Sequence, residues 1–336
     1  MANPNIRLSL ALDAGIPTPP PHGALIFNAL DDGDYSALGG AICVQWFKPT
    51  CTHLEAMEFR TAQVASDHSD FALVEITRSK PQTLGLIAQA YDALNMGGTL
   101  IVNGDKTNGI ESHQKTLRKL FDINGVISKA HGKVFWLTKG ARPDVLDQWL
   151  TDMAPTEIED GLLTQAGVFS AGHVDKGSAL LVEHLPAHLS GKGADLGAGW
   201  GYLSRAVLAR GDKVKSLDLI EADFNALQCA RLNVTDPRAA FHWDDATKFS
   251  NKGYDFIIMN PPFHQTRKAE PDIGKAFIAH ASAMLSPKGQ LWLVANRQLA
   301  YEDTLDTHFV QVNPVTQTAQ FKVIHASRPK KPTRPR

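Results

Sequence analysis

The chain has 336 residues, enough for two domains with separate hydrophobic cores. Hydrophobic residues make up 43% and charged residues 21%, as in folded soluble proteins, and the net charge of −1 excludes a bulk attraction to nucleic acid. Contacts with nucleic acid would therefore have to come from local basic patches. No apolar run approaches a membrane span, and residues 1–12 lack the pattern of a signal peptide, so we expect a cytoplasmic protein without a membrane anchor.

The first half of the chain, to about Pro155, alternates short apolar runs with helical periodicity, which is typical of an α/β domain. The predicted strands are Ala24 to Phe27, Ala41 to Trp46, Phe71 to Ile76, Thr99 to Val102 and Val134 to Leu137. The clearest predicted helices run from Gln82 to Leu94 and from Glu111 to Phe121. A further helix between Arg142 and Pro155 is expected to connect this half to the next.

The second half repeats this plan from Ser178 onward. Its predicted helices are Ser178 to Leu185, Tyr202 to Arg210, Asn225 to Leu232 and Ile273 to Leu285. Its predicted strands lie around Ala194, at Val214 to Ile220, Phe256 to Met259 and Gln290 to Ala295, followed by extended pieces at Val310 to Val312 and Gln320 to His325. Residues 328–336 are basic and proline-rich, so we expect a disordered tail.

An internal similarity links the two halves. Residues 70–74 (DFALV) align with residues 255–259 (DFIIM), and Gly98 and Leu100 align with Gly289 and Leu291 one helix later. We interpret this as duplication of one α/β domain, although unrelated buried strands also draw on few residue types.

The first copy differs from the second where chemistry is expected. It lacks a glycine loop, and Glu75-Ile76-Thr77-Arg78 stands where the second copy has Asn260-Pro261-Pro262-Phe263. The first copy is therefore predicted to have lost the chemical activity of this domain.

Asn260 and the two prolines after it are the strongest candidate for a substrate site. Residues 256–259 are apolar throughout, as in a strand buried on both faces, which puts Asn260 at the edge where open α/β sheets bind ligands. The prolines remove two N–H donors, leaving a rim of acceptors that suits a substrate amine. Phe263 offers a flat face for a planar ring. The structural alternative is a strand-ending turn with Phe263 in the core.

Residues 195–202 (DLGAGWGY) form a glycine-rich turn between a predicted strand and helix. Gly197, Gly199 and Gly201 allow sharp turning and close approach to a ligand. The dinucleotide fingerprint GxGxxG requires a glycine where Tyr202 stands. Asp195 would repel a pyrophosphate but attract the ammonium and sulfonium of S-adenosylmethionine. The pattern therefore favours this methyl donor over NAD or FAD.

Two further strand ends carry acidic residues. Glu221 follows the second strand of this half and suits the two ribose hydroxyls of the cofactor, with Asp218 as an alternative inside the apolar run. The next strand end, at residues 243–246 (WDDA), offers a carboxylate for the adenine amine, with Asp245 preferred. Three cysteines without a CxxC pair, and Cys51 with His53 but no second ligand pair, indicate no metal site and no disulfide framework.

The second half resembles class I S-adenosylmethionine-dependent methyltransferases, and residues 260–263 resemble the (Asn/Asp)-Pro-Pro-aromatic motif of enzymes that methylate exocyclic or amide nitrogens. More narrowly, residues 167–170 (GVFS), 260–264 (NPPFH), 294–297 (VANR) and 321–323 (FKV) resemble bacterial ribosomal RNA guanine-N2 methyltransferases of the RsmC and RlmG type. That family has two tandem Rossmann-like domains, the first without cofactor binding.

The resemblance implies a degenerate domain over residues 1–155 and a catalytic domain with a seven-stranded, mostly parallel sheet over residues 156–327. It implies that Asn260 and the Pro261 carbonyl hold the target amine while Phe263 stacks on the guanine. It also implies cofactor binding by Asp195, Gly197, Gly199 and Glu221. His264 and Arg297 are left without a role.

A guanine N2 is buried in a paired helix, so the base has to be extruded or presented in a loop, with phosphate contacts around the pocket. Arg267 and Lys268 follow the candidate motif. In the first half, basic residues gather on and after one predicted helix: His113, Lys115, Arg118, Lys119, Lys129 and Lys133. We therefore predict that the first domain docks RNA and supports folding, although each cluster alone also fits a solvated face.

The predicted activity is methylation of a guanine N2 in ribosomal RNA by a monomer, with the small subunit preferred. A large-subunit enzyme and a protein glutamine N5-methyltransferase remain alternatives, since an amide NH2 also satisfies an acceptor rim. A DNA adenine-N6 enzyme would need a target-recognition region that the sequence does not suggest. A non-catalytic RNA-binding protein is disfavoured because the loop, Glu221 and Asn260 are all intact.

Overall fold

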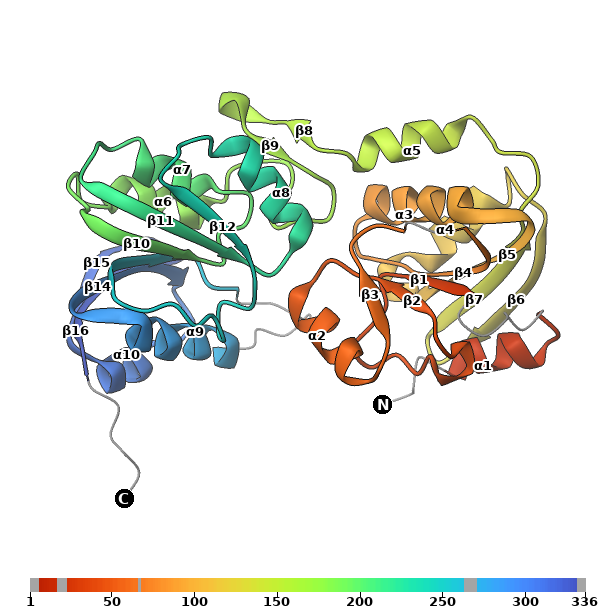
Figure 1. Cartoon of the computed structure of the whole chain (residues 1–336), viewed down its shortest axis with the longest axis horizontal. Coiled ribbons are helices and arrows are strands. Elements are labelled where there is room, and N and C mark those ends of the chain that lie inside the picture. Colours follow the sequence, from red (N-terminus) through yellow and green to blue (C-terminus); the bar gives the residue numbers. More distant parts are fainter. Residues whose placement is uncertain (1–5, 17–22, 66–67, 263–270, 331–336) are drawn as a thin grey trace, which may run out of the picture. The chain divides into compact units, whose positions relative to one another are not determined.

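The computed structural model describes residues 6–16, 23–65, 68–262 and 271–330, which divide into two compact units. Unit 1 comprises Met1–Pro155 with Gln165–Gly167, and unit 2 comprises Thr156–Thr164 with Val168–Arg336. Each unit has its own sheet with helices on both faces (Figure 1). Among the described residues, no helix combines the length and apolar character needed to cross a membrane.

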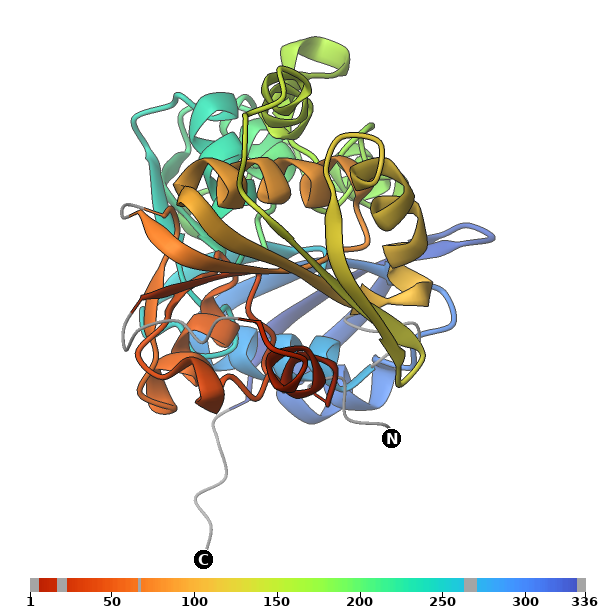
Figure 2. The ribbon, with the colours of Figure 1, turned by 90° about the vertical axis from the view of Figure 1, so that its right-hand side faces the viewer.

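Unit 1 is built on a seven-stranded sheet in the order β3-β2-β1-β4-β5-β7-β6. Its strands are β1 (Ala24–Phe27), β2 (Ile42–Val44), β3 (Arg60–Ala62), β4 (Ser69–Glu75), β5 (Leu94–Asp105), β6 (Ile123–Lys129) and β7 (Gly132–Thr138). Its helices are α1 (Ile6–Asp13), α2 (Lys48–Ala56), α3 (Lys80–Ala93), α4 (Ile110–Leu117) and α5 (Val145–Met153). The first five strands are parallel, and β6 and β7 run antiparallel to their neighbours. Helices α1 and α3 cover opposite faces (Figure 2).

Unit 2 repeats this sheet in the order β12-β11-β10-β13-β14-β16-β15. Its strands are β10 (Gly191–Leu196), β11 (Val214–Glu221), β12 (Ala239–Trp243), β13 (Tyr254–Met259), β14 (Leu285–Asn296), β15 (Phe309–Gln317) and β16 (Phe321–Pro329), and a short pair is formed by β8 (Thr156–Glu157) and β9 (Leu163–Thr164). Its helices are α6 (Lys176–His184), α7 (Tyr202–Leu208), α8 (Phe224–Asn233), α9 (Pro271–Met284) and α10 (Glu302–His308).

Strand β13 is buried on both faces, as its sequence predicts. Phe256 and Ile258 pack into the core on one side of the sheet, and Ile257 and Met259 pack into the core on the other. Burial of consecutive side chains explains why this strand shows no polar alternation.

The two units share one topology and one strand register. Phe71 of β4 pairs with Ala24 of β1, and Phe256 of β13 pairs with Gly193 of β10. The next pairing in each sheet, β4 with β5 and β13 with β14, shifts register one residue before the phenylalanine, between Ser69 and Phe71 and between Tyr254 and Phe256. The predicted fold class, two tandem α/β domains with a seven-stranded mostly parallel sheet in the second, is confirmed, and the first sheet also has seven strands.

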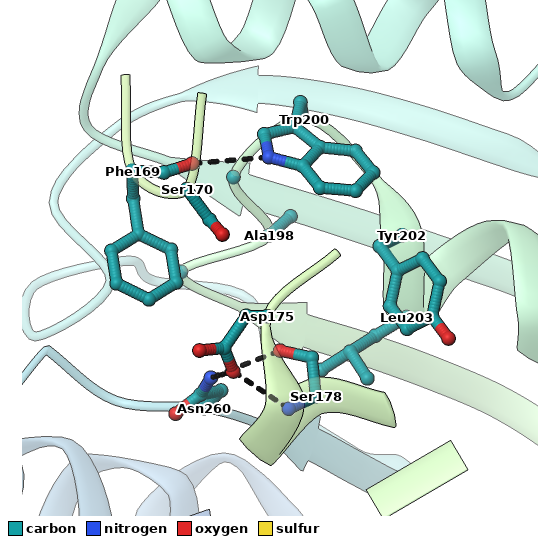
Figure 3. A pocket seen from close by; sticks show the side chains of 11 residues that line it. Phe169, Ser170, Asp175, Ser178, Ala198, Trp200, Tyr202, Leu203 and Asn260 are labelled. Atoms are coloured by element: carbon teal, nitrogen blue, oxygen red, sulfur yellow. Dashed lines mark hydrogen bonds between the residues drawn. The ribbon is translucent and has the colours of Figure 1, made fainter. Parts of the chain in front are cut away.

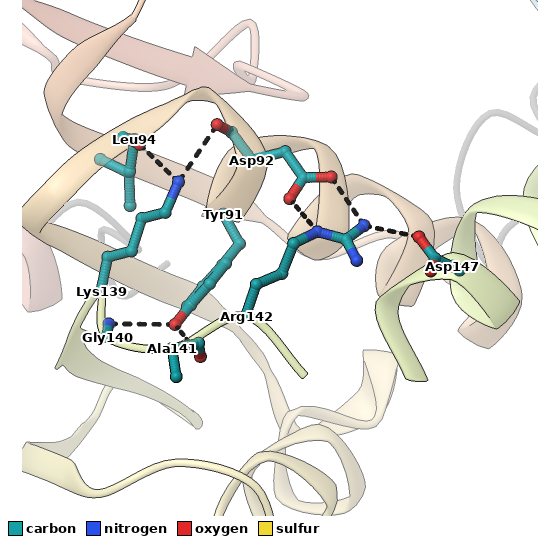
Figure 4. Close-up of polar contacts among 8 residues, drawn as sticks. All are labelled: Tyr91, Asp92, Leu94, Lys139, Gly140, Ala141, Arg142 and Asp147. Carbon is teal, nitrogen blue, oxygen red and sulfur yellow. Dashed lines mark hydrogen bonds and ion pairs between the residues drawn. The ribbon is translucent and has the colours of Figure 1, made fainter. Parts of the chain in front are cut away.

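Polar contacts attach α5 to unit 1 (Figure 4). The Arg142 guanidinium donates to both carboxylate oxygens of Asp92 at 2.6 and 3.0 Å and to Asp147 of α5 at 2.8 Å. The Tyr91 hydroxyl, at the end of α3, bonds the backbone of residues 140–141. The helix predicted between Arg142 and Pro155 is thus present and belongs to unit 1.

The C-terminal region differs from the sequence prediction. Strand β16 extends through Arg328 and Pro329, where the disordered tail was predicted to begin, because β15 continues to pair with it as far as Phe309 opposite Pro329. Phe309 is only 1% exposed and holds that end of the hairpin against the core. Residues 331–336 lie outside the described part of the chain.

Candidate active site

The glycine loop follows β10 and adopts left-handed backbone angles at each glycine. Gly197 and Gly199 have φ of 73° and 55°, and Gly201 has φ of 88°. A Cβ on Gly199 would meet nothing within 4 Å, whereas a Cβ on Gly201 would lie 2.9 Å from Val234. Gly199 therefore faces open space where a ligand can approach. Gly201, also predicted as a cofactor residue, allows α7 to start close to α8.

Glu221 lies against this loop at the end of β11. Its carboxylate accepts hydrogen bonds from the backbone N–H groups of Gly199 and Asp223, both at 2.7 Å. Burial raises its pKa above the usual value. The alternative, Asp218, accepts from the Tyr254 hydroxyl at 2.5 Å and lies 3.1 Å from His242, in a separate cluster away from the loop. Of the two candidates, Glu221 is the one beside the glycine turn.

Asp195 is fully buried beneath the loop and does not line the hollow described below. Its Oδ2 accepts from the Ser204 hydroxyl of α7 at 2.7 Å, and its Oδ1 has no partner among the described residues. Burial raises the pKa of Asp195 to about 7, although the Ser204 hydrogen bond opposes this, and Asp223 is likewise raised to about 7. The carboxylates of Asp195 and Asp223 are both close enough to Glu221 for its charge to raise their pKa values, and an acidic group of this kind fits a cationic ligand and disfavours a pyrophosphate.

Asp245 stabilises its own turn after β12. Its Oδ1 accepts from the backbone N–H of Thr247 at 2.8 Å and from the Thr247 hydroxyl at 2.6 Å. The neighbouring Asp244 N–H donates to the Glu221 carbonyl at 3.1 Å, so this turn lies beside the end of β11. A contact of Asp245 with an adenine amine remains a prediction.

Asn260 stands at the carboxyl end of β13, next to the glycine loop (Figure 3). Its side-chain Nδ2 donates to Asp175 Oδ2 and to Ser178 Oγ, each at 2.9 Å. Pro261 is buried and Pro262 is half-buried. The predicted residues Phe263, His264, Arg267 and Lys268 lie outside the described part of the chain.

A single hollow joins the loop to Asn260. Its volume is about 390 Å³, including the part open to solvent. Its walls are Phe169, Ser170, Asp175, Ser178, Gly197, Ala198, Gly199, Trp200, Tyr202, Leu203 and Asn260. The glycine loop and the Asn-Pro-Pro strand end, which were predicted to share a site, therefore line one hollow.

Four wall residues precede β10 and received no role from the sequence. Phe169 is 55% exposed, and its carbonyl accepts from the Trp200 indole at 3.1 Å, which ties its segment to the glycine loop. Asp175 and Ser178 start helix α6. The signal that could have found them is the Asp-x-x-Ser pattern before an apolar run, which marks a helix N-terminus. Phe169 and Ser170 belong to residues 167–170 (GVFS), which contributed only to the family resemblance.

The basic residues predicted in unit 1 are only partly available to RNA. Lys115, Arg118, Lys119 and Lys129 are exposed, and Lys133 pairs with Glu111 at 3.3 Å. The inclusion of His113 was wrong: it is 2% exposed, and burial lowers its pKa to about 4, so it carries no charge at neutral pH. It occupies the inner face of α4 with Ile110, Gln114 and Leu117, at helical spacing. In unit 2, Arg297 is exposed after β14.

Known families match both units. A model described as the methyltransferase small domain matches residues 159–325, and one described as its N-terminal domain matches residues 42–152. A ribosomal RNA small subunit methyltransferase C from Psychromonas ingrahamii is 30% identical over 264 residues, covering 76% of this chain and 75% of the relative. The chain belongs to this family. Another member, from Hahella chejuensis, is 33% identical over 232 residues, covering 67% of this chain and 68% of the relative.

A solved structure supports the fold of the family along nearly the whole chain. It is the T. thermophilus 16S rRNA N2 G1207 methyltransferase (RsmC) in complex with AdoMet and guanosine. It superimposes with a TM-score of 0.74 at 23% identity and covers 94% of this chain and 90% of its own. The family resemblance predicted from short motifs is thus confirmed.

Proposed function

We propose that this protein transfers a methyl group from S-adenosylmethionine to the exocyclic N2 amine of a guanine in small-subunit ribosomal RNA. The observation that carries the proposal is the hollow that joins the glycine loop to the acceptor rim at Asn260. Membership in a family named for methylation of small-subunit ribosomal RNA supports the substrate. We expect it to act as a cytoplasmic monomer.

The residues around the loop fit the cofactor. Gly197 and Gly199 would let the cofactor approach the backbone of the loop closely, and Glu221 would accept hydrogen bonds from the ribose hydroxyls of the cofactor. The carboxylates of Asp195 and Glu221 favour a positively charged ligand, and Asp245 would receive the adenine amine. Bound S-adenosylmethionine supplies an activated methyl carbon.

The residues at the rim act on the amine. Its lone pair is delocalised into the guanine ring, so the amine is a poor nucleophile. The Asn260 side-chain oxygen and the Pro261 carbonyl would accept its two hydrogens, orient the nitrogen and stabilise the positive charge that develops on it. The new N–C bond forms as the donor S–C bond breaks, and one amine proton then leaves to water. We place Phe263 against the guanine ring.

Exposed basic residues of unit 1 are proposed to dock the RNA, together with Arg267 and Lys268 in unit 2. Replacing Lys115, Arg118 and Lys119 by glutamine is expected to raise KM for the RNA substrate and to flatten its dependence on salt, since phosphate contacts release counterions. The cofactor Kd should stay the same. An unchanged KM and salt dependence would contradict docking by unit 1 through these residues.

The decisive experiment is transfer of labelled methyl to ribosomal RNA and ribosomal particles from cells lacking this protein, with nucleoside analysis and an Asn260→Ala control. N2-methylguanosine in small-subunit RNA, lost in the variant, would support the proposal. Label in large-subunit RNA would reassign the subunit. Label absent from RNA while the cofactor is bound would overturn the proposal and direct attention to protein glutamine amides.

A further inference from the structure

We propose that Asp175 and Ser178 form an amide clamp, which fixes the side chain of Asn260 so that only its oxygen faces the target amine. This inference rests on the proposed function and adds two positioning residues to it. Figure 3 shows both residues of the amide clamp converging on the Asn260 side chain from the start of α6. Neither residue needs to touch the reacting atoms.

The amide orientation follows from donor and acceptor chemistry. Asn260 Nδ2 lies 2.9 Å from Asp175 Oδ2 and 2.9 Å from Ser178 Oγ. A carboxylate only accepts hydrogen bonds, so the nitrogen of the Asn260 amide, and not its oxygen, must face Asp175. Rotating the Asn260 amide by half a turn would place its oxygen against the carboxylate oxygen of Asp175. Both amide hydrogens are therefore used within the protein, which leaves Oδ1 as the free group.

The amide clamp is itself held rigidly by the fold. Asp175 is the N-cap of α6, and the same Oδ2 accepts from the Ser178 backbone N–H at 2.7 Å. Between them, a Cβ on Gly177 would lie 3.0 Å from the Phe321 ring of β16 and 3.1 Å from Asp175 Oδ2. Glycine at this position thus lets Phe321 pack tightly behind the cap. Side chains of α6, β13 and β16 fix one another at the edge of the hollow.

This arrangement sets the hydrogen-bonding polarity of the site. With its N–H groups occupied, Asn260 can accept from a substrate amine but cannot donate to a carbonyl. A base that presents an acceptor there, such as the O6 of guanine, would leave two facing acceptors unpaired. The Asp175 carboxylate also polarises the Asn260 amide and strengthens its oxygen as an acceptor. The amide clamp therefore contributes both to selection of an N–H donor and to rate.

A double-mutant cycle separates positioning from direct cofactor binding. Asp175→Ala is expected to lower kcat by about 10- to 100-fold and Ser178→Ala, which keeps the N-cap, by about 3- to 10-fold. The cofactor Kd should change by less than about twofold in both. In an Asn260→Ala background, neither change should lower kcat further, because the side chain they position is gone. Additive losses in that background, or a weaker cofactor Kd in both, would overturn the amide clamp.

Reversing the hydrogen bond gives a second, independent test. Asn260→Asp places two carboxylates face to face and should lower kcat by at least about 100-fold. Adding Asp175→Asn restores a donor opposite an acceptor and should recover about tenfold or more, with partial recovery of the Tm of the unliganded protein. A double variant as impaired as Asn260→Asp in both readouts overturns the amide clamp. A wild-type protein that binds the cofactor without methylating RNA, with the Tm coupling intact, overturns the proposed function alone.

Discussion

The two units share a fold but differ in the residues that stand at the carboxyl ends of their strands. By strand register, Asn28 after β1 corresponds to Gly197 after β10. Both residues have left-handed φ, 59° and 73°, and each N–H donates to the end of the neighbouring strand, Val44 or Ile220, at 2.9 Å. The sharp turn after the first strand is thus retained in unit 1, where no cofactor site is predicted. Backbone geometry alone does not make a binding site.

The end of the second strand also keeps its backbone geometry in both units, while the side chains there differ. Gln45 corresponds to Glu221, and each accepts through Oε1 from the N–H two residues later, at 2.9 and 2.7 Å. In unit 2 the Gly199 N–H bonds to Glu221, whereas its counterpart in unit 1, that of Leu30, bonds to the hydroxyl of Tyr35. Tyr35 is 1% exposed and belongs to the core of unit 1. Its hydroxyl takes the role that the Glu221 carboxylate has in unit 2.

The fourth strand completes the comparison. Glu75 stands where unit 2 has Asn260, and it accepts from the side chain of Asn103 at 2.8 Å, which in turn accepts from Arg7 of α1 at 2.7 Å. In both units a helix before the first strand is thus linked to the end of the fourth. Unit 1 uses this link to satisfy a buried charge, and unit 2 uses it to orient an amide beside a hollow.

The largest expected effect comes from giving unit 2 the leucine of unit 1. Gly199→Leu should abolish cofactor binding, weakening Kd by more than about 100-fold, because its side chain would enter the open space above the loop at a left-handed φ. The matched control is Leu30→Gly, which should create no cofactor binding, since the Tyr35 hydroxyl already bonds that N–H. Calorimetry on both variants measures this. Cofactor binding by Gly199→Leu would show that the residue at this position does not explain the difference between the two units.

Removing Arg7 should destabilise unit 1 by about 3 kcal/mol, because its buried guanidinium pairs with Asp105 and donates to Asn103 beside Glu75. The pKa of Glu75 is raised to about 7 by burial, and Arg7 opposes this, so the variant Arg7→Met raises it further. A carboxyl with a raised folded pKa loses stability as pH rises through that pKa, so the loss should be larger at pH 8 than at pH 5.5. Urea unfolding of the full chain tests this, with exposed Arg118→Met as the control, expected to change stability by less than about 0.5 kcal/mol.

Glu221→Gln gives the second strand of unit 2 the glutamine that stands at the end of the second strand in unit 1. We expect the cofactor Kd to rise by about 10- to 100-fold, because one acceptor oxygen becomes a donor facing backbone N–H groups and a charge-assisted hydrogen bond is lost. Gln45→Glu, the reciprocal change, should give unit 1 no affinity for the cofactor. An unaltered Kd in Glu221→Gln would remove this residue from the proposed cofactor site.

The smallest expected effect is a pH dependence of cofactor binding, which arises from carboxylates of unit 2. The pKa values of Asp195 and Asp223 are raised to about 7, so these groups take up protons as pH falls below 7 and lose the charge that attracts a cation. Cofactor Kd should therefore rise by up to about tenfold per pH unit between pH 7 and pH 6. Asp195→Asn should reduce this slope, whereas Glu75→Gln in unit 1 should leave it unchanged. Titrations at pH 6, 7 and 8 provide the measurement.

Sequence reasoning found what depends on local residue chemistry. The glycine loop, the buried strand before Asn260 and Glu221 at a strand end were all visible, because each requires particular residue types at fixed spacing. Edge elements such as β6 were missed, since its exposed residues include Asn124, Ser128 and Lys129 and it has no apolar run. The contacts of Asn260 with Asp175 and Ser178 were also invisible, because 82 to 85 residues separate the partners and only the fold brings them together.

The position of β16 has a consequence for synthesis of the chain. Although β16 is the last described strand, it lies between β14 and β15, and its Phe321 packs behind the amide clamp. Unit 1 has all of its sheet strands by Thr138, so it can fold while translation continues. Unit 2 cannot complete its sheet until the residues of β16 have left the ribosome. A nascent chain therefore carries a finished first unit well before it has a working active site.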